Sequence, residues 1–110
     1  DIAKRYLTEI NNPKIQMQYQ PDWAYSVFHL FVVIAENKEN FENHLKTNGI
    51  NPAYHYPVAC HLQKAYSHLN HKIGDFPNSE YLAAHCISLP MYAELTDEQV
   101  HKVITVINRY

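Results

Sequence analysis

His55 and Tyr56 stand side by side immediately before Pro57. An imidazole and a phenol together can donate hydrogen bonds to a phosphate, a carboxylate or a sugar hydroxyl. The pair is expected to leave the end of a strand and enter an irregular loop, where functional groups are usually held on a rigid scaffold. The alternative is that Tyr54 and Tyr56 only pack against the domain, and the residues alone favour this packing role. The bond between Tyr56 and Pro57 is a candidate cis peptide, because X-Pro bonds adopt cis more readily than others.

Cysteine and histidine are also neighbours, at Cys60-His61 and at His85-Cys86. Thiolates and imidazoles are zinc ligands, but adjacent residues rarely bind one ion, so we expect no metal site. Nucleophilic catalysis by Cys60 is not expected either, because no third group to orient His61 can be identified. Two cysteines do not make a disulfide framework in a chain of 110 residues, and both are expected to be reduced.

Composition limits the remaining classes of function. The 110 residues form one domain of ordinary size, and nine basic against eleven acidic residues give a net charge of −2. Without a basic patch we expect no nucleic-acid partner. The longest apolar run, Leu30 to Ala35, is too short to cross a membrane, and no leader is visible, so we expect a cytoplasmic protein. Gly49 and Gly74 are isolated, which excludes a glycine-rich phosphate loop.

The first half of the chain predicts a helix, a strand, a second helix and a second strand. Residues 1–10 have apolar side chains at helical spacing and stop before Pro13. Residues 26–35 are mostly β-branched or aromatic, which predicts a central strand covered on both faces. Residues 38–48 form an amphipathic helix that Gly49 should cap, and residues 50–56 predict a strand interrupted at Pro52.

The second half is less regular. Residues 57–75 are expected to be irregular, with a short helical turn at 62–69, before a helix over 78–87 and an extended segment at 89–92. Thr96 and Gln99 have the spacing of a capping box, which opens a last helix. Its apolar stripe consists of Val100, Val103, Ile104 and Ile107. The element order predicts an α+β two-layer sandwich, with a small antiparallel or mixed sheet of three or four strands covered by helices.

Several blocks together resemble the carboxy-terminal domain of the DegT/DnrJ/StrS family. They are residues 27–33, Asn48-Gly49-Ile50, His55-Tyr56-Pro57 with His61-Leu62-Gln63, and residues 88–92, in that order. Members of this family are sugar aminotransferases that use pyridoxal phosphate (PLP) and have the aspartate-aminotransferase fold (fold type I). The resemblance implies that residues 1–110 are the small C-terminal domain of such an enzyme, and that its large PLP-binding domain is absent from this chain.

The resemblance also implies an activity. Family members move an amino group, usually from L-glutamate, to a nucleotide-linked keto-sugar for antibiotic or cell-surface polysaccharide biosynthesis, and they act as homodimers. PLP would be bound in the full-length protein, because no lysine here stands in a recognisable PLP setting. We therefore expect no catalytic or cofactor-binding residue in this chain, and an isolated chain that is inactive and binds no cofactor.

Three residues are carried over as substrate-binding. His55 and Tyr56 match the family's His-Tyr-Pro block, which lies near the active-site opening, and His61 is a weaker neighbour. The chain departs from the family at Ile34, where many members have arginine, and no arginine clamp for a glutamate carboxylate can be named.

Two other functions remain open. The chain could be a non-catalytic module that binds a sugar nucleotide or a partner, or part of a PLP-dependent sugar dehydratase. A small domain without its large domain should also expose an apolar face around Tyr54, Tyr56 and the first helix, and should self-associate.

Overall fold

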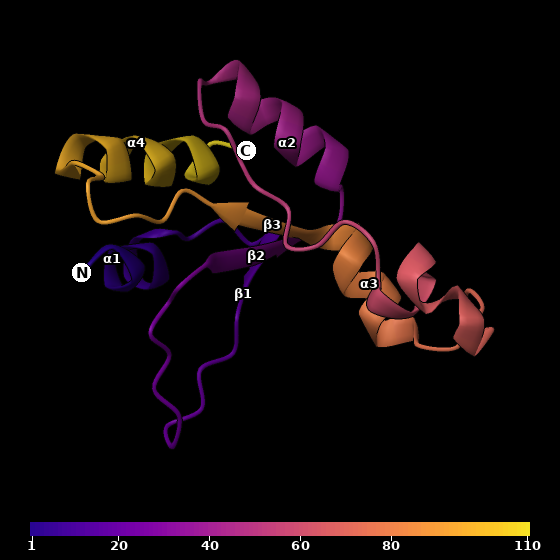
Figure 1. The fold of residues 1–110 in the computed structure, drawn as a ribbon. Helices are drawn as coiled ribbons and strands as arrows, with labels where there is room; N and C mark the ends of the chain where they lie inside the picture. Colours follow the sequence, from indigo (N-terminus) through magenta and orange to yellow (C-terminus); the bar gives the residue numbers. More distant parts are fainter.

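A three-stranded antiparallel sheet with the strand order β1-β2-β3 forms the centre of the computed structural model, which describes residues 1–110 (Figure 1). The strands are β1 (Ile15–Met17), β2 (Phe31–Ala35) and β3 (Cys86–Leu89). The α-helices are α1 (Ile2–Glu9), α2 (Lys38–Thr47), α3 (Pro77–His85) and α4 (Asp97–Asn108), and the 3-10 helices are η1 (Cys60–Leu62) and η2 (Lys64–Leu69). The predicted fold class, a small antiparallel sheet with helices, is confirmed.

The core lies on one face of the sheet. Phe31, Val33 and Ala35 alternate along β2 and are buried, and Val33 pairs with the buried Ile87 of β3. Helices α1, α2 and α4 cover this face, and their buried side chains belong to the same cluster. These are Tyr6, Phe41, Leu45, Val100, Val103, Ile104, Val106 and Ile107. The apolar stripe predicted for the last helix is therefore confirmed.

Local signals predict the start of α4 and the end of α2 correctly. The Thr96 hydroxyl accepts a hydrogen bond from the Gln99 amide at 3.3 Å, and the Gln99 side chain accepts one from the Thr96 amide at 2.9 Å. This completes the predicted capping box of α4. Gly49, which follows the end of α2, has φ of 73°, the left-handed conformation that glycine adopts without steric cost.

The predicted strand over residues 26–35 is wrong in its first half. Phe28 has φ of 48°, which interrupts an extended strand, and β2 begins only at Phe31. The apolar residues before it belong to the long loop between β1 and β2, which extends away from the helices in Figure 1. The expected cover on both faces is also absent, because Val32 and Ile34 are only half-buried.

Strand pairing explains three further differences. The segment 50–56 is not a strand; its one ladder contact is a bridge between Ala53 and Ser88, and the preceding Pro52 has no amide to extend it. Strand β1 was not predicted, since three residues are too few to show a pattern. Helix α3 stops at His85, because Cys86 and Ile87 pair with β2 instead of continuing the helix.

None of the helices has both the length and the apolar composition that a membrane span requires.

Candidate functional site

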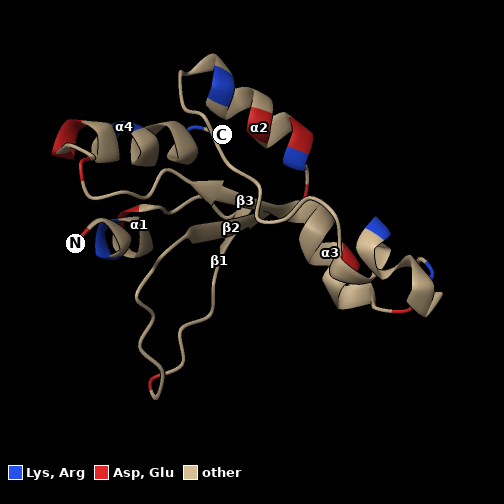
Figure 2. Ribbon diagram, in the orientation of Figure 1, with Lys and Arg blue, Asp and Glu red and all other residues tan.

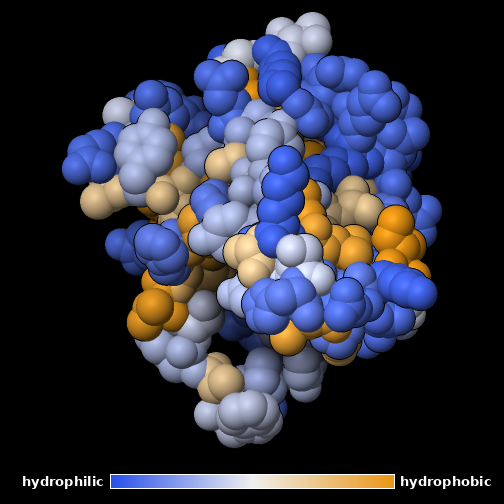
Figure 3. All heavy atoms as spheres, turned by 45° about the vertical axis from the view of Figure 1, so that its right-hand side comes forward, coloured by the Kyte–Doolittle hydropathy of each residue, from blue (hydrophilic) through white to orange (hydrophobic).

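The face of the sheet opposite the core is hollowed. Val32 and Ile34 of β2 and Cys86 of β3 form its floor, and His55 and Tyr56 line its wall. The hollow has a volume of about 620 Å³ and is bounded further by the start of the β1–β2 loop and by α3. Figure 3 shows apolar side chains reaching the surface among hydrophilic ones. An apolar floor with a few polar groups at its edge is the usual form of a small-molecule site.

His55 is held in place by the sheet. Its Nδ1 lies 2.9 Å from the hydroxyl oxygen of Ser88, a residue of β3 that is only 2% exposed. The other ring nitrogen, Nε2, has no hydrogen-bond partner within the chain. When Nδ1 accepts a hydrogen bond from the Ser88 hydroxyl, Nε2 carries the ring proton and can donate a hydrogen bond to a ligand oxygen.

Tyr56 is more exposed than His55. Its side chain is 70% exposed, and its ring meets the His55 ring edge-on with centroids 5.5 Å apart. The packing role considered for it is therefore not what the structure shows. The cis peptide bond lies between His55 and Tyr56, one bond before the predicted Tyr56–Pro57 position.

Tyr54 has the packing role instead. Its hydroxyl is buried without a hydrogen-bond partner, and the ammonium of Lys38 lies 5.3 Å from its ring centroid. Burial, and then the neighbouring Glu42 carboxylate, raises the pKa of Tyr54 above its ordinary value. This phenol is neutral at physiological pH and does not reach the hollow.

His61 lies apart from the other two predicted site residues. Its side chain is 7% exposed, its Nε2 lies 3.0 Å from Oε1 of Glu80 in α3, and its ring packs against Phe76 with centroids 4.8 Å apart. The structure therefore brings His55 and Tyr56 together at the hollow and places His61 against α3, outside the lining.

Both cysteines line the hollow, and both are free thiols. Cys60 is exposed, whereas burial raises the pKa of Cys86 above that of an ordinary thiol. Nowhere in residues 1–110 do three or more His, Cys, Asp or Glu side chains gather in a way that could hold a metal ion.

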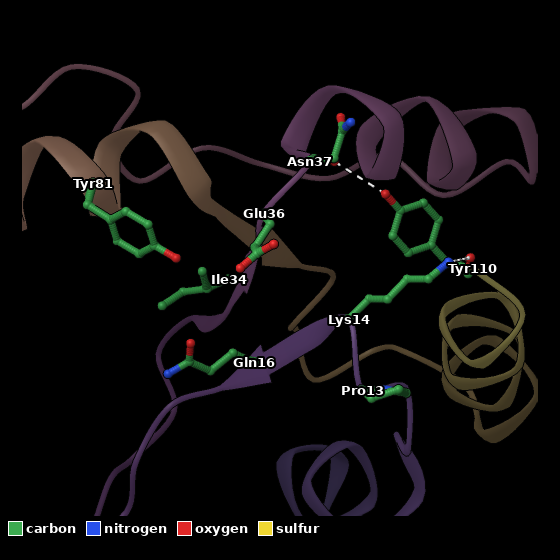
Figure 4. A pocket seen from close by; sticks show the side chains of 8 residues that line it. All are labelled: Pro13, Lys14, Gln16, Ile34, Glu36, Asn37, Tyr81 and Tyr110. Atoms are coloured by element: carbon green, nitrogen blue, oxygen red, sulfur yellow. Dashed lines mark hydrogen bonds between the residues drawn. The ribbon is translucent and has the colours of Figure 1, made fainter.

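A second hollow of about 430 Å³ lies further along the same face (Figure 4). Its lysine is already engaged: Nζ of Lys14 donates to the Tyr110 carbonyl at 2.8 Å and lies 5.0 Å from the Tyr110 ring centroid. Figure 4 shows Lys14 turned toward Tyr110 and away from Tyr81. This hollow contains none of the predicted site residues, and no uncommitted cation faces it.

The charges show no single-sign surface. Along α2, lysines stand at the two ends with glutamates between them, and charges of both signs are scattered over the other elements (Figure 2). Paired side chains include Arg5 with Glu9, at 2.7 Å, and Lys46 with Glu42. Mixed charges of this kind do not form the electropositive stripe by which proteins bind a phosphate backbone.

Ser88 is a part of the candidate site to which no sequence pattern pointed. It was part of a recognised block, but nothing in its spacing linked it to His55, which lies 33 positions earlier. The available signal was its chemistry: a hydroxyl inside an apolar strand, Cys86-Ile87-Ser88-Leu89, needs a partner when it is buried.

Comparison with known proteins gives the same family along the whole chain. The model of the DegT/DnrJ/EryC1/StrS aminotransferase family matches residues 1–108. The dTDP-3-amino-3,6-dideoxy-alpha-D-galactopyranose transaminase of Aneurinibacillus thermoaerophilus is 37% identical over 110 residues, which is 100% of this chain and 30% of that protein. The erythromycin biosynthesis sensory transduction protein EryC1 of Saccharopolyspora erythraea is 36% identical and covers 96% of this chain and 29% of its own length.

Solved structures agree with these relatives. The crystal structure of S. venezuelae DesV in complex with a ketimine intermediate has a TM-score of 0.93 and 31% identity, covering 98% of this chain and 29% of that chain. An aminotransferase from Brucella abortus has a TM-score of 0.85 and 30% identity over 98% of this chain. The chain spans about 30% of the length of the curated relatives it matches. Because the family model matches all but the last two residues, the chain belongs to the DegT/DnrJ/EryC1/StrS aminotransferase family.

Proposed function

We propose that residues 1–110 are the small C-terminal domain of a PLP-dependent aminotransferase that moves an amino group from L-glutamate to a nucleotide-linked keto-sugar. The observation that carries the proposal is the likeness to DesV, whose structure holds a ketimine intermediate and whose fold matches 98% of this chain. Two of the curated relatives that match 99% or more of the chain are transaminases whose names specify a dTDP-sugar.

The residues of this chain do not fit the whole PLP site. PLP chemistry needs a lysine that forms a Schiff base, and no lysine lines the hollow beside His55 and Tyr56. Lys14 and Lys38 donate to backbone carbonyls, and Lys46 pairs with Glu42. We therefore propose that the cofactor lysine lies in the part of the family protein that this chain does not span.

The role of this domain is to bind the sugar substrate. The Ser88 hydroxyl fixes the His55 ring, which leaves Nε2 free to hydrogen-bond a sugar hydroxyl or a phosphate oxygen. The Tyr56 hydroxyl, on an exposed ring beside it, provides a second donor. The apolar floor below them excludes water from one side of the bound substrate. His61, in η1, supports this wall through its contact with Glu80 of α3.

The isolated chain is expected to form no Schiff base with PLP and to transfer no amino group. The measurement is an absorption spectrum of the chain titrated with PLP, followed by borohydride reduction and peptide mass spectrometry. Scattered low-level labelling of exposed lysines such as Lys64 and Lys72 is the background. Saturable labelling of one lysine would contradict the proposal that the cofactor site lies elsewhere.

Calorimetry separates this function from a stand-alone binding module. Micromolar binding of a sugar nucleotide by the isolated chain would favour the binding-module function. A small domain that supplies only part of an aminotransferase active site should bind the sugar nucleotide more weakly. A dehydratase would share the same small domain, and it differs in the residue that occupies the lysine position of the large domain.

We propose a homodimer for the complete protein and self-association for this chain. The apolar exposure that supports this lies on the β1–β2 loop, where Trp23, Tyr25 and Val27 are 83–94% exposed. The prediction of an exposed apolar face around Tyr54 and the first helix is wrong in part, because Tyr54 is half-buried and Tyr6 of α1 is in the core.

We also propose a cytoplasmic location, since both cysteines are unpaired.

Self-association should depend on this loop. Light scattering of the chain is expected to show a mass that rises with concentration, and the double variant Trp23→Ser/Tyr25→Ser should lower that rise, because it removes two large apolar contacts. Ile73→Ser is the matched control, since Ile73 is as exposed as Val27 but lies outside the loop. A strictly monomeric wild-type chain at high concentration would contradict this prediction.

A further inference from the structure

The segment from Pro57 to Phe76 has almost no apolar core of its own. It contains η1 and η2, and Ala59 is its one buried apolar residue. Even its large apolar side chains, such as Leu69 and Ile73, are exposed. Figure 1 shows η1 and η2 beside α3, at the end of the molecule away from α1. A segment that buries so little apolar surface has to be held in place by polar contacts.

Glu80, in the first turn of α3, provides these contacts. Its two carboxylate oxygens accept the Gly74 amide at 2.8 and 3.0 Å, and Oε1 also accepts the Phe76 amide at 3.4 Å. The same Oε1 lies 3.0 Å from Nε2 of His61. One carboxylate therefore ties the beginning of the segment, at His61, to its end, at Gly74 and Phe76.

The carboxylate is ionised when it does this. The Gly74 amide is the main cause that holds the pKa of Glu80 below its ordinary value, and the contact with His61 acts in the same direction. Hydrogen bonds to a carboxylate are shorter and stronger than those between neutral groups.

The rings around Glu80 complete the cluster. Phe76 lies between His61 and His71, with ring centroids 4.8 and 5.0 Å away. Asp75 accepts the Lys72 amide at 2.9 Å and lies 3.4 Å from Nδ1 of His71. These contacts stiffen the far end of the segment, but Glu80 makes the hydrogen bonds that connect it to His61 and to α3.

The near end of the segment belongs to the hollow. Val58, Ala59 and Cys60 line it together with His55 and Tyr56, and Cys60 precedes His61 directly. We propose that Glu80 is a positioning residue that fixes the wall of the substrate hollow by holding His61 and the 57–76 segment against α3. This inference rests on the proposed function only for its kinetic consequence, since the structural part concerns the chain itself.

Amide hydrogen exchange of the 110-residue chain tests the structural part. Glu80→Ala is expected to speed exchange at Gly74 and Phe76 by about tenfold or more, because these amides lose the carboxylate that accepts their hydrogen bonds. Exchange should also rise at Leu62, whose amide donates to the Ala59 carbonyl beside His61. Exchange in β2 and β3 should stay unchanged. The control is Glu39→Ala, because Glu39 also lies in the first turn of a helix, α2, but makes no hydrogen bond to a loop.

Kinetics of the full-length enzyme test the consequence. Glu80→Ala should raise KM for the nucleotide-sugar by about tenfold, with little change in KM for L-glutamate, and Glu80→Gln should recover part of the loss because its amide oxygen still accepts from Gly74. Unchanged exchange in residues 57–76 overturns the inference, and so does faster exchange with an unchanged KM for the sugar. If the wild-type enzyme shows no transamination at all, the proposed function fails, while the exchange experiment still decides whether Glu80 holds the segment.

Discussion

The His55→Ala variant of the full-length enzyme is expected to lose about 10- to 100-fold in kcat/KM for its nucleotide-sugar. The reason is the loss of Nε2 as a partner for a charged or strongly polar substrate group, a hydrogen bond worth about 1.5–3 kcal/mol. Steady-state kinetics with the sugar varied at saturating L-glutamate provide the measurement. The fold should persist, because the His55 side chain is only partly buried and lies outside the core.

Three companion variants sharpen this result. Tyr56→Phe removes only the exposed hydroxyl and should cause a smaller loss of the same kind. Ser88→Ala keeps the His55 ring but removes its anchor, so its effect should lie between the two. His68→Ala changes an exposed histidine outside the hollow and should leave kcat/KM unchanged. A His55→Ala enzyme as active as the His68→Ala enzyme would remove His55 from the site.

Replacing Phe41 with alanine is expected to lower the free energy of unfolding of the chain by about 3–5 kcal/mol, the usual cost of truncating a buried phenylalanine. Phe41 is 0% exposed, and its ring packs against Tyr110 with centroids 5.0 Å apart. Because small domains have only about 5–15 kcal/mol of stability, this change leaves little margin. Urea denaturation followed by circular dichroism measures the difference.

The control for Phe41→Ala is Tyr19→Ala, an aromatic truncation on the β1–β2 loop. Tyr19 is 86% exposed, so its removal should change the free energy of unfolding by no more than about 0.5 kcal/mol. Equal losses for the two variants would mean that α2 does not close the core in the way the structure shows.

Helices were predicted well because their signals are local. The capping box of Thr96 and Gln99, and the glycine after α2, act over three or four residues, and the structure reproduces both. Strands depend on partners that are distant in sequence. Cys86 and Ile87 look like the end of a helix, yet they pair with Ile34 and Val33 some fifty positions earlier. No pattern within one segment reveals that competition.

The candidate site shows the same contrast between residues that are neighbours in sequence and residues that meet only in the fold. His55 and Tyr56 are adjacent and both line the hollow. The family resemblance predicted a site for this pair, whereas the residues alone favoured packing for Tyr56. The group that orients each histidine did not follow. Ser88 lies 33 positions after His55, and Glu80 lies 19 positions after His61. Only the folded sheet and the packing of α3 bring these pairs together.

We propose that this chain is the substrate-binding small domain of a PLP-dependent sugar aminotransferase. The sequence of the coding DNA immediately upstream of the Asp1 codon tests it most directly. We expect an in-frame large domain whose PLP-binding segment carries a lysine. A histidine at that lysine position would make the protein a dehydratase, and a stop codon followed by a start codon close to Asp1 would leave the small domain alone as a binding module. Either result would contradict the claim.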